Sequence, residues 1–243
     1  MTELDSAAEI AARCAEELSR PMERVFAVVT QVSEAMATVC ESAFAEGCTL
    51  GSPDLAALSF TIQSALARDR LPIGVGVVAD EGLLSDQDHY IEWLQRDQAG
   101  IPAPLLVDLD PASDDRYDYS EREWFRVPKQ QGRRMVSGPY FDYRGTDRYA
   151  LTFAVPVLVG ERFVGVAGAD VSVPDIESDL LPVLRQIVQR AALLNHERRV
   201  VTANTPYYVT GERVSPEDLD ASIQVVDVMS DLGWKLMMTM PQT

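Results

Sequence analysis

The sequence predicts an α+β fold in which long N-terminal helices come first and an antiparallel sheet follows. Before Leu71, apolar residues recur at spacings of three and four, which is the period of an amphipathic helix. After Leu71 the pattern changes to short runs rich in valine and isoleucine, separated by glycine and polar residues, which is typical of strands and turns. Helices followed by a meander of strands is the order that α+β proteins show.

Three helices are expected before Leu71, at residues 5–20, 21–48 and 53–68. Pro21 is expected to kink the chain between the first two, because proline cannot donate a backbone hydrogen bond inside a helix. The second helix carries one apolar stripe, formed by Val25, Val28, Val29, Val32, Met36 and Val39. Such a stripe packs on its own domain or, as the alternative, forms the seam of a homodimer through the N-terminal helices.

Five strands are expected in the middle of the chain, at residues 71–78, 104–109, 134–143, 149–159 and 162–173. The last two are joined at Gly160-Glu161, where glycine supplies the positive φ of a tight hairpin. A helical turn is expected at 89–95, which carries Tyr90 and Trp93, and a helix at 175–188.

The last part of the chain is a small β-rich extension. Two strands around a polar turn are expected at 191–205, a capped helix within 215–232 and a final strand at 234–240. The predicted organisation is therefore a module at 1–188 with its N-terminal helices, and an extension at 189–243.

Composition and charge exclude several classes of function. The formal net charge of −17 over 243 residues disfavours nucleic acid and anionic membrane surfaces as partners, since both would be repelled. The three cysteines follow no metal spacing and the two histidines are far apart, so no metal and no cofactor are expected. No run of 18 apolar residues occurs and the N-terminus is acidic, which predicts a cytoplasmic protein that does not span a membrane.

The stretch from Gly138 to Val173 carries a resemblance to a known family. It contains GPYFDY and then LTFAVPVLVGERFVGVAGADVSV, a pair of strands of which the second ends in a glycine-rich run and an aspartate. In this the chain resembles the Cache domains, an extracellular-sensor family with a PAS-like antiparallel sheet. The resemblance covers about residues 20–188 as one module. The tail, with Gly233-Trp234-Lys235, is similar to a reduced second module.

A finer match points to the amino-acid-binding members of that family. Those members carry a tyrosine, an arginine, a tryptophan, a second tyrosine and an aspartate in fixed order, which here fall on Tyr117, Arg122, Trp124, Tyr140 and Asp170. The resemblance implies that these five residues bind a small ligand, and Asp142, two residues past the second tyrosine, is expected to join them. Typical members also have a membrane helix and a signalling output domain, and neither is expected here. The output would then be a downstream partner protein, a rearrangement of a dimer or sequestration of the ligand.

The chemistry of these residue types suits a zwitterion. Arg122 offers a planar fork for a carboxylate, and Trp124 can add an indole N–H donor. Asp170 would hold an ammonium group, with Tyr117 and Tyr140 adding hydroxyl groups or ring faces.

Each of these side chains also has a structural alternative. Arg122 lies among Glu121, Glu123 and Arg126 and could be part of surface charge patterning. Trp124 could be a core anchor, and Asp142 could pair with Arg144 or Arg148.

The sequence therefore predicts a non-catalytic sensor of a small amino-acid-like molecule. Two alternatives stay open: a dimeric interaction protein whose pocket is vestigial, and an enzyme that acts on amino acids. The enzyme has little support, because the chain contains no phosphate loop, no GxSxG and no HExxH motif.

Overall fold

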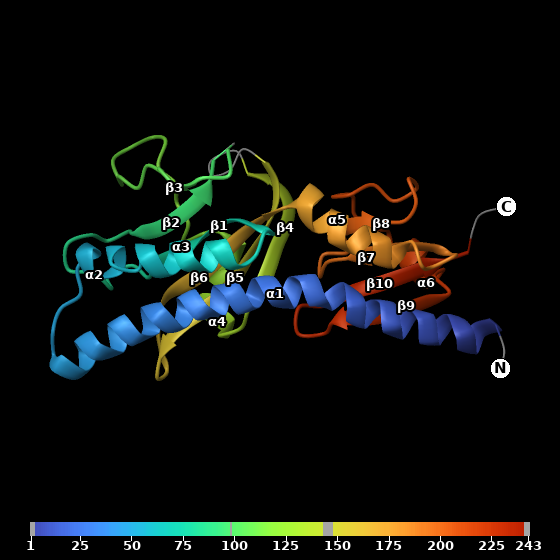
Figure 1. Cartoon of the computed structure of the whole chain (residues 1–243), viewed down its shortest axis with the longest axis horizontal. Helices are drawn as coiled ribbons and strands as arrows, with labels where there is room; N and C mark the ends of the chain where they lie inside the picture. The colour runs from blue at the N-terminus through green and yellow to red at the C-terminus, as the bar shows by residue number, and fades with distance from the viewer. Residues whose placement is uncertain (1–2, 98, 143–147, 241–243) are drawn as a thin grey trace. The chain divides into compact units, whose positions relative to one another are not determined.

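The computed structural model describes residues 3–97, 99–142 and 148–240, which form two compact units. The central unit comprises Arg24–Ser137 and Phe141–Ser172. The C-terminal unit comprises Val173–Thr243 together with Met1–Glu23 and Gly138–Tyr140. The α+β class is confirmed, with a long N-terminal helix, an antiparallel sheet and a smaller C-terminal sheet (Figure 1). The division into 1–188 and 189–243 stays a prediction.

A single helix, α1 (Glu3–Glu46), replaces the two helices expected before residue 48. Pro21 lies inside α1 and is buried, so the expected break there is wrong. Proline removes one backbone donor, and the buried side chains of Leu18, Met22 and Val25 on both sides of it stabilise the helix through their packing. Most of the apolar stripe from Val25 to Met36 is buried within the chain, and a homodimer stays a prediction.

The central unit is built on a six-stranded sheet with the order β3-β2-β1-β6-β5-β4. Its strands are β1 (Pro72–Ala79), β2 (Ile91–Arg96), β3 (Pro102–Pro104), β4 (Met135–Asp142), β5 (Arg148–Val159) and β6 (Arg162–Ser172). The pairs β1–β2, β1–β6, β2–β3 and β5–β6 are antiparallel. The hairpin between β5 and β6 turns at Gly160 with φ of 60°, as the sequence predicts.

One face of this sheet packs on helices. Phe26 of α1 meets Phe153 of β5 edge to face, with ring centroids 5.1 Å apart. Ser59, the first residue of α3 (Ser59–Arg68), donates a hydrogen bond to Glu92 of β2. The registers place Phe153 and Glu92 on the same face, since side chains alternate along each strand. The short helix α2 (Ser52–Ala56) precedes α3.

The opposite face is called the glycine face here, because Gly74, Gly76 and Gly168 lie on it in neighbouring strands. Trp93 faces the same side, opposite Gly76, and Asp170 lies opposite Gly74. The helix α4 (Glu123–Gln131) contributes Trp124 and Phe125 to a buried cluster with residues of this face, and that cluster consists of Val78, Tyr119, Trp124, Phe125, Val127, Met135, Ala154 and Val166.

Two local expectations for the central unit are wrong. Residues 89–95 are largely the strand β2 rather than a helical turn, because pairing with β1 and β3 on both sides overrides the short local pattern. The apolar run 104–109 is not a strand beyond Pro104, which ends β3.

The C-terminal unit is a four-stranded antiparallel sheet with the order β8-β7-β10-β9. The strands β7 (Arg190–Leu194), β8 (Val200–Ala203) and β10 (Trp234–Thr239) confirm the expected tail strands. The helix α5 (Val173–Leu184) precedes them, close to the helix expected at 175–188. The helix expected within 215–232 is wrong in extent: α6 (Pro216–Asp220) is one turn, and β9 (Gln224–Met229) follows it.

Candidate functional site

Asp170 is the buried acid of the glycine face. β6 is buried from Val164 to Ser172, and the Asp170 residue is 8% exposed. Thr152, directly opposite on β5, donates its hydroxyl to Asp170 Oδ1 at 2.6 Å. A buried carboxylate requires hydrogen-bond donors, and Thr152 supplies one of the several that its two oxygens can accept. The register of β5 and β6 therefore places the Asp170 carboxylate and the Thr152 hydroxyl next to each other.

Trp93 lies across the three glycines beside this acid. A Cβ added at Gly74 would lie 2.5 Å from Trp93 Nε1, and one at Gly168 would lie 3.2 Å from Trp93 Cη2. At Gly76 an added Cβ would lie 2.7 Å from Trp93 Cε3. Glycine is therefore required at these positions because the indole ring and, at Gly76 and Gly168, the backbone of the neighbouring strand occupy the space that side chains would need.

Arg122 precedes α4 and has extended backbone angles, with φ of −72° and ψ of 139°. Its side chain is exposed, and its guanidinium carbon lies 5.7 Å from the centroid of the Tyr117 ring. The carbonyl of Arg122 accepts hydrogen bonds from the backbone N–H groups of Phe125 and Arg126, which start the helix. The cation and the aromatic face are thus close enough for a cation–π contact.

Tyr117 borders an open hollow of about 230 Å³ that Leu106, Val107, Asp108 and Asp115 also line. The backbone N–H of Tyr117 donates to the Asp108 carbonyl at 2.7 Å, which holds the two sides of this loop together. Tyr117 and Arg122 are therefore brought together by the loop that leads into α4.

Trp124 lies in the first turn of α4 and is 8% exposed. Its ring meets Phe125 at right angles, with centroids 6.1 Å apart, and it belongs to the cluster that includes Val78 and Val166 of the glycine face. Trp124 is therefore packed in the core, which agrees with its alternative interpretation as a core anchor. It lies on the same side of the sheet as Asp170.

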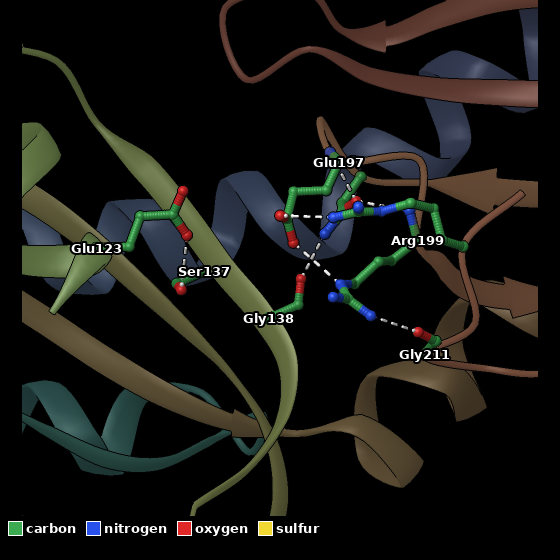
Figure 2. Close-up of polar contacts among 8 residues, drawn as sticks. Glu123, Ser137, Gly138, Glu197, Arg199 and Gly211 are labelled. Carbon is green, nitrogen blue, oxygen red and sulfur yellow. Dashed lines mark hydrogen bonds and ion pairs between the residues drawn. The ribbon is translucent and has the colours of Figure 1, made fainter. Parts of the chain in front are cut away.

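The start of α4 is tied to the sheet by Glu123. Its carboxylate accepts a hydrogen bond from Ser137 of β4 at 3.1 Å (Figure 2). Because Glu123 lies between Arg122 and Trp124 in the sequence, this contact fixes the backbone that carries both side chains.

Two of the expected site residues are placed differently. Tyr140 lies on β4 within Gly138–Tyr140, the stretch that belongs to the C-terminal unit. Asp142 ends β4, and its side chain falls outside the described residues, as do its expected partners Arg144 and the side chain of Arg148.

Within the C-terminal unit, Gly138 is held by Asn195. The Asn195 side chain donates to the Gly138 carbonyl at 2.6 Å, while its Oδ1 accepts from the backbone of Glu197 and Arg199. Glu197 in turn pairs with Arg199 at 3.0 Å, and Arg199 donates to the Gly211 carbonyl (Figure 2). This buried asparagine therefore positions the stretch that ends at Tyr140.

The potential metal-ligating side chains of the described residues do not gather into a cluster. Among residues 3–97, 99–142 and 148–240, no group of three or more His, Cys, Asp or Glu side chains could hold a metal ion. Cys14 and Cys40 are buried and burial raises the pKa of both thiols, that of Cys40 to about 11. Of the three cysteines, Cys14 and Cys40 are thus buried thiols and Cys48 is exposed.

The comparisons with known proteins agree with this architecture. Residues 59–178 match the family model of the first PDC sensor domain of methyl-accepting chemotaxis protein-like proteins. The resemblance to Cache-type sensors is confirmed. The match covers α3, the whole six-stranded sheet and the start of α5, and therefore includes Asp170, Trp93 and Arg122. No curated protein matches the sequence.

Solved structures share the fold at low identity. The extracellular domain of the putative histidine kinase soHK1S-Z6 is 16% identical, with a TM-score of 0.64 over 98% of this chain and 93% of that one. The ligand-binding domain of the Campylobacter jejuni chemoreceptor Tlp3, in complex with 4-methylisoleucine, is 9% identical, with a TM-score of 0.63 over 97% and 89%. That of the Pseudomonas aeruginosa PAO1 amino acid chemoreceptor PctB, in complex with L-Arg, is 14% identical, with a TM-score of 0.58 over 96% and 92%.

The expectation of a cytoplasmic protein is wrong. Two of the solved structures with this fold are extracellular domains of putative histidine kinases, which points to placement outside the cytoplasm. Composition could not show this, because an acidic globular domain has the same solvated surface in either compartment. Separately, no helix in the described parts of the chain is long and apolar enough to cross a membrane.

Sequence reasoning missed Trp93 and Thr152 as neighbours of the site. The available signal was the alternation of Gly74 with Gly76 and of Gly168 with Asp170, since glycines two apart on a strand mark a face that something approaches closely.

Proposed function

We propose that this chain is the sensory, non-catalytic part of a receptor and that its central unit binds a small amino-acid-like zwitterion outside the cytoplasm. The observation that carries the proposal is the buried carboxylate of Asp170, which accepts a hydrogen bond from Thr152. It lies on a sheet face where glycines leave out side chains. A carboxylate in that position is suited to hold an ammonium group in a charge-assisted hydrogen bond.

The other end of the ligand is assigned to the start of α4. Arg122 is exposed, so its guanidinium fork is available to a carboxylate, and Trp124 follows two residues later in the first turn of α4. Tyr117 lies against Arg122 and can orient it or add its hydroxyl to the amino group. Tyr140, which the family resemblance also implies, and Asp142 stay predictions.

The relatives support an amino acid as the ligand class. Solved structures with this fold carry L-Arg in PctB, L-valine in Tlp3 and GABA in PctC. Those ligands share a carboxylate and an amine and differ in everything else. We therefore assign the carboxylate to Arg122 and Trp124 and the amine to Asp170. The signal would pass to a downstream partner protein.

Isothermal titration calorimetry against a panel of amino acids tests this proposal. We expect at least one of them to bind with micromolar affinity, which a ligand of about ten heavy atoms can reach. Arg122→Ala should weaken that binding about 10- to 100-fold, because a charge-assisted hydrogen bond contributes about 1.5–3 kcal/mol.

Arg126→Ala is the matched control, since Arg126 is an exposed arginine one turn further along the same helix. It should bind like the wild type. If no amino acid binds at millimolar concentration, or if both arginine variants behave alike, the proposal is wrong.

A further inference from the structure

The indole N–H of Trp93 is a buried donor with no hydrogen-bond partner among the described residues. Trp93 is 7% exposed, so its N–H is not compensated by bulk water either. A buried donor without a partner destabilises the folded protein, so such a group calls for an explanation, and a bound molecule that accepts the hydrogen bond is one.

The register places this donor beside Asp170. Trp93 Nε1 lies 2.5 Å from where a Cβ of Gly74 would be, and Gly74 is the direct partner of Asp170 across β1 and β6. Opposed Cβ positions in an antiparallel pair are about 5 Å apart, so the N–H and the carboxylate lie on one face within reach of a single small molecule. The far edge of the ring reaches Gly168, two residues before Asp170 on the same face.

Trp234 shows that an unsatisfied indole alone is not sufficient evidence. Its Nε1 also lacks a partner among the described residues, and the residue is fully buried in the C-terminal sheet. Leu236 and Met238 share its face of β10 and Met229 pairs with it on β9, and no buried acid lies in the described part of this sheet. Trp93 differs because its donor lies next to the acid that the proposed function assigns to the ligand amine.

We infer that Trp93 determines ligand specificity by donating its N–H to a neutral oxygen acceptor on the side chain of the bound amino acid. The inference rests on the proposed function, since Asp170 must hold the amine for the side chain to lie over Gly74. The acceptor is neutral because a second carboxylate there would be repelled by Asp170. The ligand class is therefore small polar amino acids that carry a hydroxyl or an amide carbonyl, and the indole ring limits the length of the side chain.

Matched ligand pairs test this by calorimetry. Serine is compared with alanine and homoserine with 2-aminobutyrate, which differ by one hydroxyl group. Asparagine is compared with leucine, which has a similar shape and lacks the amide. In the wild type at least one polar member should bind about two- to twelvefold more tightly than its apolar partner, as one neutral hydrogen bond contributes about 0.5–1.5 kcal/mol. Trp93→Phe should remove that preference while the affinity for the apolar member changes little.

Trp234→Phe is the control variant, because it removes the other unsatisfied indole and should leave the preference unchanged. Should Trp93→Phe not fold, the wild type labelled with ¹⁵N-tryptophan gives the same answer. The Trp93 indole proton should move downfield with the polar ligand of a pair and not with its apolar partner.

The failures of the two proposals are distinguishable. Absence of binding by every amino acid would overturn the proposed function. Binding that depends on Arg122 but shows no preference within any pair, or a preference that survives in Trp93→Phe, would overturn the inference about Trp93 alone.

Discussion

The two units of this chain are each built on a sheet with a buried tryptophan, and they differ in what surrounds that tryptophan. Each contains a buried tryptophan whose indole nitrogen lacks a partner among the described residues, and each contains a buried threonine that donates to a carboxylate. In the C-terminal unit, Trp234 lies among leucine and methionine side chains. In the central unit, Trp93 lies on glycines next to Asp170. The glycines and the buried acid, rather than the sheet itself, are what distinguish the proposed site.

The glycine face should therefore tolerate substitution least. In Gly76→Val the new Cβ would lie 2.2 Å from the backbone oxygen of Glu92 and 2.7 Å from both Cα and Cε3 of Trp93, so the neighbouring strand itself would have to shift. We expect a loss of about 3 kcal/mol or more in the free energy of unfolding, measured by urea titration.

Gly51→Ala is the control for that experiment, because its nearest neighbour would lie at an ordinary 3.4 Å. It should change stability by less than about 1 kcal/mol. Equal losses in the two variants would show that Trp93 does not lie on Gly76 as described.

Substitution of Asn195, the buried asparagine of the C-terminal unit, should cause the next largest loss of stability. Asn195→Ala removes the donor to Gly138 and the acceptor for two backbone N–H groups, and the residue is 2% exposed. We expect a loss of about 2–3 kcal/mol by thermal or chemical unfolding, since three backbone groups in partly buried hydrogen bonds lose their partner. A change below about 0.5 kcal/mol would contradict this role.

The two threonines give a direct comparison of the units. Thr152→Val removes a donor to the buried Asp170, whereas Thr202→Val removes a donor to Glu177, which is only half-buried. Thr152→Val should cost about 1–3 kcal/mol and Thr202→Val less, because water can replace the hydroxyl at Glu177. Urea titration of both variants measures the difference, and the reverse order would mean that Asp170 is better solvated than its burial indicates.

The smallest effect concerns the cysteines. Burial raises the pKa of the Cys14 thiol and that of Cys40 to about 11, whereas Cys48 is exposed. A raised pKa means that the reactive thiolate appears only as the pH approaches that value. Iodoacetamide at pH 8 should therefore modify Cys48 alone in the folded protein, as mass spectrometry of peptides can show. Rapid modification of Cys40 would contradict its burial.

Much of the fold could be predicted from the sequence because its signals are local. Glycine at 160 and the branched runs around it determine the β5–β6 hairpin, and the stripe from Val25 to Met36 determines the buried face of α1. Pro21 and the segment 89–95 were mispredicted because packing on distant residues overrides a local preference there.

The candidate site could be predicted in its residue types and only partly in its geometry. Asp170 was recognisable as a lone acid in an apolar strand, and the structure buries it. The placement of Thr152 and Trp93 beside it depends on the registers of three strands, which no single segment of sequence contains. The compartment was mispredicted because composition does not encode it.

The central claim is that the carboxylate of Asp170 holds the amine of the ligand. A double-mutant cycle by calorimetry tests it most directly, with the wild type and Asp170→Asn each titrated with the bound amino acid and with the same acid in which a hydroxyl replaces the amine. The account predicts a coupling energy of about 1.5–3 kcal/mol between the Asp170 carboxylate and the amine. A coupling indistinguishable from zero, with ligand binding retained in Asp170→Asn, would contradict it.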